Sequence, residues 1–174
     1  MKKRLILAAV LICCTVLGAA ALPSNALADG QDPGVTVTVE RSTTPQPSSA
    51  SAPATMHSTV AQEVLILRDG FGLELARFGM TVSFSYDGSI VYSPTTTPYG
   101  NVSSLGSAGG WQYYGVIGSS GNWESWGGHW NGGHWSYRQG KFIASQLGFQ
   151  YDSWYPWIRI HVRGNGTWWD EYGG

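Results

Sequence analysis

The stretch that decides the fold of this 174-residue chain is Thr81-Val-Ser-Phe-Ser-Tyr-Asp-Gly-Ser-Ile-Val-Tyr92. In its first half Val82, Phe84 and Tyr86 point to one side of an extended backbone, and hydroxyl side chains point to the other. The dipeptide Asp87-Gly88 favours the positive φ angles of a tight hairpin turn, and an apolar Ile-Val-Tyr run begins the return strand. The stretch therefore predicts a β-hairpin with one apolar face.

The same two-residue period recurs over residues 62–174, where Gly and Pro interrupt the pattern at short intervals. Near the end, Ile158, Ile160 and Val162 are expected to face inward, and the intervening residues Arg159, His161 and Arg163 to face outward. Further strands are predicted at residues 64–68, 73–78, 111–117 and 141–147. We predict an all-β domain over residues 62–174, built as a small antiparallel β-sandwich or a partly closed barrel.

The N-terminus has the layout of a signal peptide. A positive Lys2-Lys3-Arg4 is followed by apolar residues 5–22, and Ala26-Leu27-Ala28 matches the pattern at which signal peptidase cuts. We predict residues 1–28 as a signal peptide cleaved after Ala28; an uncleaved anchor is the alternative.

Cleavage would leave a secreted chain with no transmembrane segment and no cysteine, since both cysteines lie within residues 1–28. A disulfide-free exported domain favours a single-membrane bacterium as its source.

Residues 29–61 are predicted to be a disordered linker or a pro-segment, because residues 42–61 are dominated by Ser, Thr, Pro and Ala. Within this segment residues 35–39 alternate like a strand. We interpret them as part of the leader, and an added strand of the sheet is the alternative.

The charge and the aromatic content of the chain limit the classes of partner that it can bind. Charged residues make up only 12% of the chain and the formal net charge is −1, which argues against nucleic acid as a partner. All nine Trp, nine Tyr and five Phe residues fall within residues 62–174. We expect most of these rings to fill the core and a minority to lie exposed on a sheet face.

The richest aromatic stretch predicts a second hairpin. Asn131-Gly132 is expected to form its turn, which would place His129 opposite His134. Alternation then puts Ser125 and both histidines on one face and four aromatic residues on the other, namely Trp126, Trp130, Trp135 and Tyr137. We predict these four aromatic residues as a ligand-binding face for cell-wall glycan or a lipid-linked precursor.

His129 and His134 are weak candidates for a metal site, because stable zinc binding needs three or four ligands. Further ligands could come from Glu124, His161, Asp170 or Glu171. The alternative is two polar residues on a sheet face, so no metal or other cofactor is predicted.

Catalytic motifs do not stand out. The chain has no nucleophile elbow, zinc-protease helix or phosphate-binding loop. A glycosidase would need two carboxylates across a cleft, and no spacing selects a pair among Glu124, Asp152, Asp170 and Glu171. The sequence favours a non-catalytic protein.

One stretch resembles a known family. Gly109-Gly-Trp-Gln-Tyr-Tyr-Gly-Val116 resembles the Gly-Gly-x-Trp-x-Tyr-Gly-Val opening of the lactococcin 972 family, with one extra aromatic residue. The later Trp and His residues up to Ser136, and residues 140–145, are similar to further parts of that family. The resemblance covers residues 109–145 and implies an exported, disulfide-free β-sandwich bacteriocin that binds the cell-wall precursor lipid II and blocks septum formation.

Three functions therefore stand open. The first is a secreted non-catalytic β-domain that binds envelope glycan or another surface ligand through exposed aromatic rings. The second is a lactococcin-type bacteriocin acting on cell-wall synthesis, and the third is a secreted hydrolase.

Overall fold

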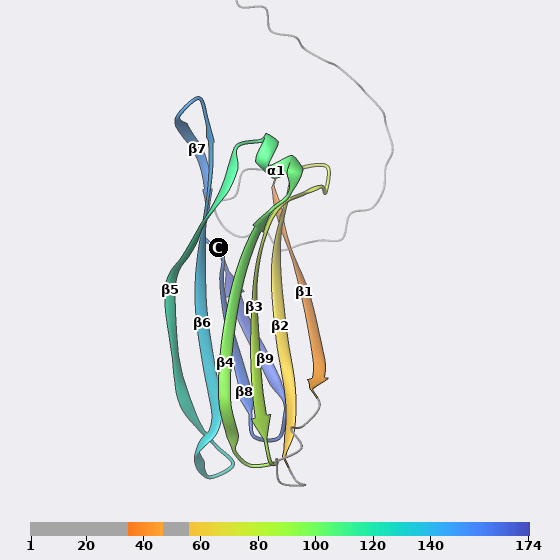
Figure 1. Ribbon diagram of the computed structural model, residues 1–174, viewed down its shortest axis with the longest axis vertical. Coiled ribbons are helices and arrows are strands. Elements are labelled where there is room, and N and C mark those ends of the chain that lie inside the picture. Colours follow the sequence, from red (N-terminus) through yellow and green to blue (C-terminus); the bar gives the residue numbers. More distant parts are fainter. Residues whose placement is uncertain (1–34, 47–55) are drawn as a thin grey trace, which may run out of the picture.

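The alternating pattern produces strands over most of the chain. A computed structural model describes residues 35–46 and 56–174, and strands take up 77% of these residues against 4% in helix. Two antiparallel sheets form a sandwich that does not close into a barrel, and their strands run along the long axis of the molecule (Figure 1). The predicted fold class is confirmed.

The first sheet has the order β1-β2-β3-β4. Its strands follow one another along the chain as β1 (Thr36–Gln46), β2 (His57–Arg68), β3 (Glu74–Tyr86) and β4 (Val91–Val102). Residues 73–78 and 81–86, expected to lie in separate strands, belong to the continuous strand β3 apart from residue 73.

The second sheet has the order β5-β6-β8-β9, and β7 also pairs with β6. The helix α1 (Ser104–Ala108) joins the two sheets at one end of the sandwich (Figure 1). The strands are β5 (Trp111–Trp126), β6 (His129–Gln146), β7 (Phe149–Trp154), β8 (Trp157–Arg163) and β9 (Trp168–Gly173).

The core forms where the apolar faces of the two sheets meet. Val82 and Phe84 of β3 are buried, as are all three alternate apolar residues of β8. The predicted turn at Asp87-Gly88 is present, with Gly88 at φ 101°. The Asp87 carboxylate accepts the amide of Ile90 at 2.9 Å and holds the turn. The sequence pattern thus predicted both of these faces and the turn between β3 and β4.

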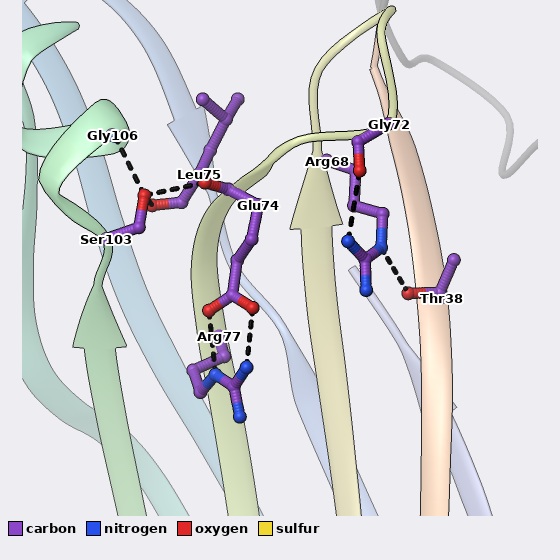
Figure 2. A network of polar contacts seen from close by, with 8 residues as sticks. All are labelled: Thr38, Arg68, Gly72, Glu74, Leu75, Arg77, Ser103 and Gly106. Carbon is purple, nitrogen blue, oxygen red and sulfur yellow. Dashed lines mark hydrogen bonds and ion pairs between the residues drawn. The ribbon is translucent and has the colours of Figure 1, made fainter.

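Polar contacts at the α1 end of the sandwich tie the strand ends together (Figure 2). The Ser103 hydroxyl caps α1 by accepting the amide of Gly106 at 3.0 Å, and it donates to the carbonyl oxygen of Glu74 at 2.6 Å. On the neighbouring strands Arg68 donates to the hydroxyl of Thr38 at 3.0 Å. These bonds link the start of α1 to β3, and β2 to β1.

The predicted linker over residues 29–61 is wrong where the structure describes it. Residues 36–46 form strand β1, which pairs with β2 along its whole length, so the interpretation of residues 35–39 as leader is wrong and the alternative of an added strand is correct. Strand β2 begins at His57, inside the predicted linker, rather than at residue 64. Val35, Val37 and Val39 pack against the core, so burial and pairing override a polar composition. The predicted signal peptide and residues 29–34 and 47–55 lie outside the described residues.

A charged cluster holds β1 across the sandwich. Arg41 donates to both carboxylate oxygens of Asp170 on β9, at 2.8 and 2.7 Å, and to Glu63 on β2 at 3.1 Å. Glu63 is fully buried, and its second oxygen has no hydrogen-bond partner within the described chain. Burial raises the pKa of Glu63 to about 8, the negative charge of Asp170 adds to the rise, and Arg41 opposes it.

The turn of the β5–β6 hairpin differs from the prediction. It lies at Gly127-Gly128, with φ angles of 60° and 85°, and Trp126 pairs with His129. Gly132 does not have a positive φ angle; its Cβ position would overlap the carbonyl oxygen of Trp126, so this glycine is needed for close backbone approach. Two consecutive glycines suit a tight turn with two positive φ angles at least as well as Asn-Gly does.

Replacing Gly132 by alanine should therefore destabilise the protein more than replacing Gly128. Gly128→Ala meets open space and should cost about 1–2 kcal/mol from its left-handed backbone, whereas Gly132→Ala should cost roughly 3 kcal/mol or more through the clash. Urea unfolding of both variants measures the difference. A Gly132→Ala variant as stable as the wild type would contradict the observed hairpin.

The raised pKa of Glu63 predicts a pH-dependent stability. An unfolded chain releases this proton near pH 4.3, whereas the folded protein keeps it up to about pH 8. The folded state is thus stabilised by proton binding at low pH, and this stabilisation is lost as the pH rises through that window. We expect the Tm of the wild type to fall by about 10 °C more than that of Glu63→Gln between pH 5 and pH 8. Parallel pH profiles for the two proteins would refute this role of Glu63.

Candidate ligand-binding face

The burial pattern of strand β8 shows which side of the second sheet faces away from the core. Ile158, Ile160 and Val162 are fully buried, so the residues between them point away from the core. Directly paired residues of neighbouring strands share a side, and β6 pairs Trp135 with His161 and Tyr137 with Arg159. We call this outward side the aromatic face; it consists of Trp126, Trp135, Tyr137, Trp157 and Trp169 with Glu124, Arg159, His161, Arg163 and Glu171.

Two arginines lie between the rings of the aromatic face. The Arg159 guanidinium lies 5.1 Å from the Trp135 ring centre and 5.9 Å from that of Tyr137. Arg163 lies 4.4 Å from the Trp169 ring centre and 5.8 Å from that of Trp126. These distances are within the range of cation–π attraction, which holds the rings in a fixed row across β5, β6, β8 and β9.

His161 links the charged groups of the aromatic face. Its ring stacks on Trp169 with centres 4.3 Å apart and planes 13° apart. Nδ1 lies 3.2 Å from both oxygens of Glu124, and Nε2 lies 3.4 Å from Glu171, which in turn accepts from Arg159 at 2.9 Å. Hydrogen bonds thus join His161 to Glu124 and Arg159 to Glu171, while the buried Nε2 of His161 has no hydrogen-bond partner among the described residues.

The five rings of the aromatic face are half-buried, because they cover one another's edges while the sheet covers one side. The expectation that most aromatic residues fill the core is wrong. Aliphatic side chains and Met80 occupy most of the interior. Only five aromatic residues are buried, namely Phe78, Phe84, Trp111, Phe142 and Trp154.

Three of the four predicted ligand-binding residues, Trp126, Trp135 and Tyr137, come together on the aromatic face. Trp130 does not. Its side chain is 69% exposed and meets Trp123 edge-on, with ring centres 6.0 Å apart. The displaced turn and a register shift between Glu124 and Trp126 place Trp130 on the other side of the hairpin.

The predicted pairing of His129 with His134 is also wrong, because His129 pairs with Trp126 and His134 with Trp123. Within residues 35–46 and 56–174 no three His, Cys, Asp or Glu side chains group as metal ligands.

The four carboxylates considered for catalysis are dispersed. Glu124 and Glu171 flank His161, while Asp170 binds the half-exposed Arg41 of the other sheet. Asp152 on β7 accepts the amide of Ser153.

Sequence reasoning did not select Trp157, Trp169 or the two arginines as site residues. A signal was present, since the alternation over residues 158–163 already placed Arg159, His161 and Arg163 on the outward side. Pairing of β8 with β6 and β9 brings them beside the predicted rings.

Comparison of the chain with family models, curated proteins and solved structures found no match. The resemblance of residues 109–145 to the lactococcin 972 family therefore stays a prediction. In the described ranges, none of the helical residues form a segment long and apolar enough to cross a bilayer.

The row of rings predicts a stabilising role for Arg163. Arg163→Met keeps much of the apolar stem but removes the cation between Trp126 and Trp169, which should lower the free energy of unfolding by about 1 kcal/mol. Arg163→Lys keeps a cation and should lose less. Urea titrations followed by Trp fluorescence measure both, and equal stability of Arg163→Met and wild type would argue against the cation–π contacts.

Proposed function

We propose that this protein is a non-catalytic binding protein whose aromatic face binds saccharide units of cell-envelope glycan. The observation that carries the proposal is the row of half-exposed rings held by Arg159 and Arg163 on the outward side of a rigid sheet. Soluble domains rarely arrange several large aromatic rings side by side on one surface without a partner for them.

The chemistry of the aromatic face suits a sugar. One side of a pyranose ring presents C–H groups that pack on an aromatic ring, and its hydroxyls seek donors and acceptors at the ring edge. Trp135 and Tyr137 offer the apolar surface. Arg159 and Glu171 lie beside them and provide a donor and an acceptor already oriented by their mutual hydrogen bond.

Binding is favoured over hydrolysis by the state of the carboxylates. Glu124 is hydrogen-bonded to His161, and Glu171 accepts a hydrogen bond from Arg159. Such contacts fit an orienting role for the two carboxylates. The predicted signal peptide supports a location where envelope glycan is accessible.

Truncation of Trp135 tests this function. Trp135→Ala should reduce retention of the protein on purified cell-wall sacculi by at least tenfold, because the ring is central to the row. Trp130→Ala is the matched control: it removes a tryptophan from the same strand that lies outside the aromatic face, and its retention should equal that of the wild type. Thermal unfolding of both variants verifies that they fold.

Equal retention of the Trp135→Ala and wild-type proteins would overturn the proposal. The same comparison on vesicles with and without lipid II separates the bacteriocin function, for which retention should require the lipid-linked precursor rather than assembled glycan.

A further inference from the structure

The same segment of β6 that presents Trp135 and Tyr137 outward lines a cavity on its inward side. The cavity has a volume of about 310 Å³ and lies between β4, β5 and β6. This volume is at the small end of the range of about 300–1,000 Å³ for ligand pockets. The residues that bear on its chemistry are Thr96, Ser119, Ser120, His134, Ser136 and Arg138.

Arg138 brings an uncompensated positive charge to the cavity. Its side chain is half-buried, and Nη1 donates to the carbonyl oxygens of Tyr137 at 2.7 Å and Ser120 at 3.3 Å. No carboxylate in the described part of the chain forms an ion pair with it. Burial lowers the pKa of Arg138 from its very high usual value, but a guanidinium stays protonated at neutral pH.

Ser136 and His134 form the second polar element. The Ser136 hydroxyl is buried and accepts from Thr96 at 2.7 Å, so its own proton is free to point to Nδ1 of His134 at 3.4 Å. With Nδ1 accepting, neutral His134 carries its proton on Nε2. That nitrogen lies toward Gly121 at the exposed edge of the cavity and can donate to a ligand.

The cavity is therefore rich in donors. It offers the guanidinium of Arg138, the imidazole N–H of His134 and the hydroxyl of Ser119, and no carboxylate lines it. Glu124, the acidic residue that raises the pKa of His134, is held by His161 on the opposite side of the sheet.

We propose that this cavity binds a compact oxyanion: a carboxylate, phosphate or sulfate group. An oxyanion would accept charge-assisted hydrogen bonds from Arg138 and neutralise a cation that the protein leaves without an acidic partner. The site is independent of the aromatic face, because alternate residues of β6 serve the two sides.

Calorimetric titration of the protein with inorganic phosphate, sulfate and acetate at constant ionic strength tests the site. We expect saturable binding of at least one anion, weakened at least tenfold in Arg138→Gln. Lys141→Gln is the matched control, since it removes one positive charge from the same strand on its outward side, where Lys141 lies 5.9 Å from the Tyr114 ring centre. The preferred anion distinguishes a carboxylate-bearing from a phosphoryl- or sulfate-bearing ligand.

NMR titration of His134 in the wild-type protein supplies a readout that needs no variant. Burial and the nearby Arg138 lower the pKa of His134, and Glu124 partly opposes them. Bound sulfate, whose charge is constant over this pH range, should raise that pKa because it stabilises the imidazolium.

Absence of saturable binding, equal affinity in Arg138→Gln, or an unmoved His134 pKa at saturating sulfate would each overturn the proposal. Sacculus retention of Arg138→Gln tells the two sites apart, since loss of the oxyanion site alone leaves the aromatic face intact.

Discussion

The pleat of strand β6 is the constraint on which both sites depend. Its central residues pair with β5 on one side and with β8 on the other, so neither edge of this segment is free to move. Successive side chains therefore alternate strictly: Trp135 and Tyr137 enter the aromatic face, while Ser136 and Arg138 enter the oxyanion cavity. A slip of one residue would exchange the outward and inward side chains of β6, so the folded state strongly favours this register.

Much of this arrangement could be predicted from local patterns, and the rest could not. The buried and exposed faces of residues 81–86 and 158–163 follow from the period of two, because alternation of apolar and polar side chains is enough to identify the buried side of a strand. The turn of the β5–β6 hairpin was missed because Gly127-Gly128 and Asn131-Gly132 both suit tight turns. Pairing of Gly133 with Arg163 decides between them, since it requires residues 131–133 to stay extended, and that contact spans thirty positions of the chain.

Strand β1 was predicted only as the alternative for residues 35–39, and its second half was not predicted at all, for a related reason. Its Ser, Thr and Pro content is typical of a linker, and the interactions that order it are remote in sequence. Arg41 meets Glu63 and Asp170, residues that belong to different sheets. The burial of Glu63 and its raised pKa cannot be predicted from local sequence propensity. Both result from the packing of three strands against one another.

The placement of β1 at the edge of the first sheet has a practical consequence. A fragment that begins at residue 62, where the Ser-, Thr-, Pro- and Ala-rich composition ends, would lack β1 and the first residues of β2. The exposed edge of β2 would then present a long row of unpaired backbone amides and carbonyls. Such a row templates self-association, and the orphaned acidic side chains beneath it would add to the instability. Aggregation of that fragment would reflect a missing neighbour rather than any property of the sandwich itself.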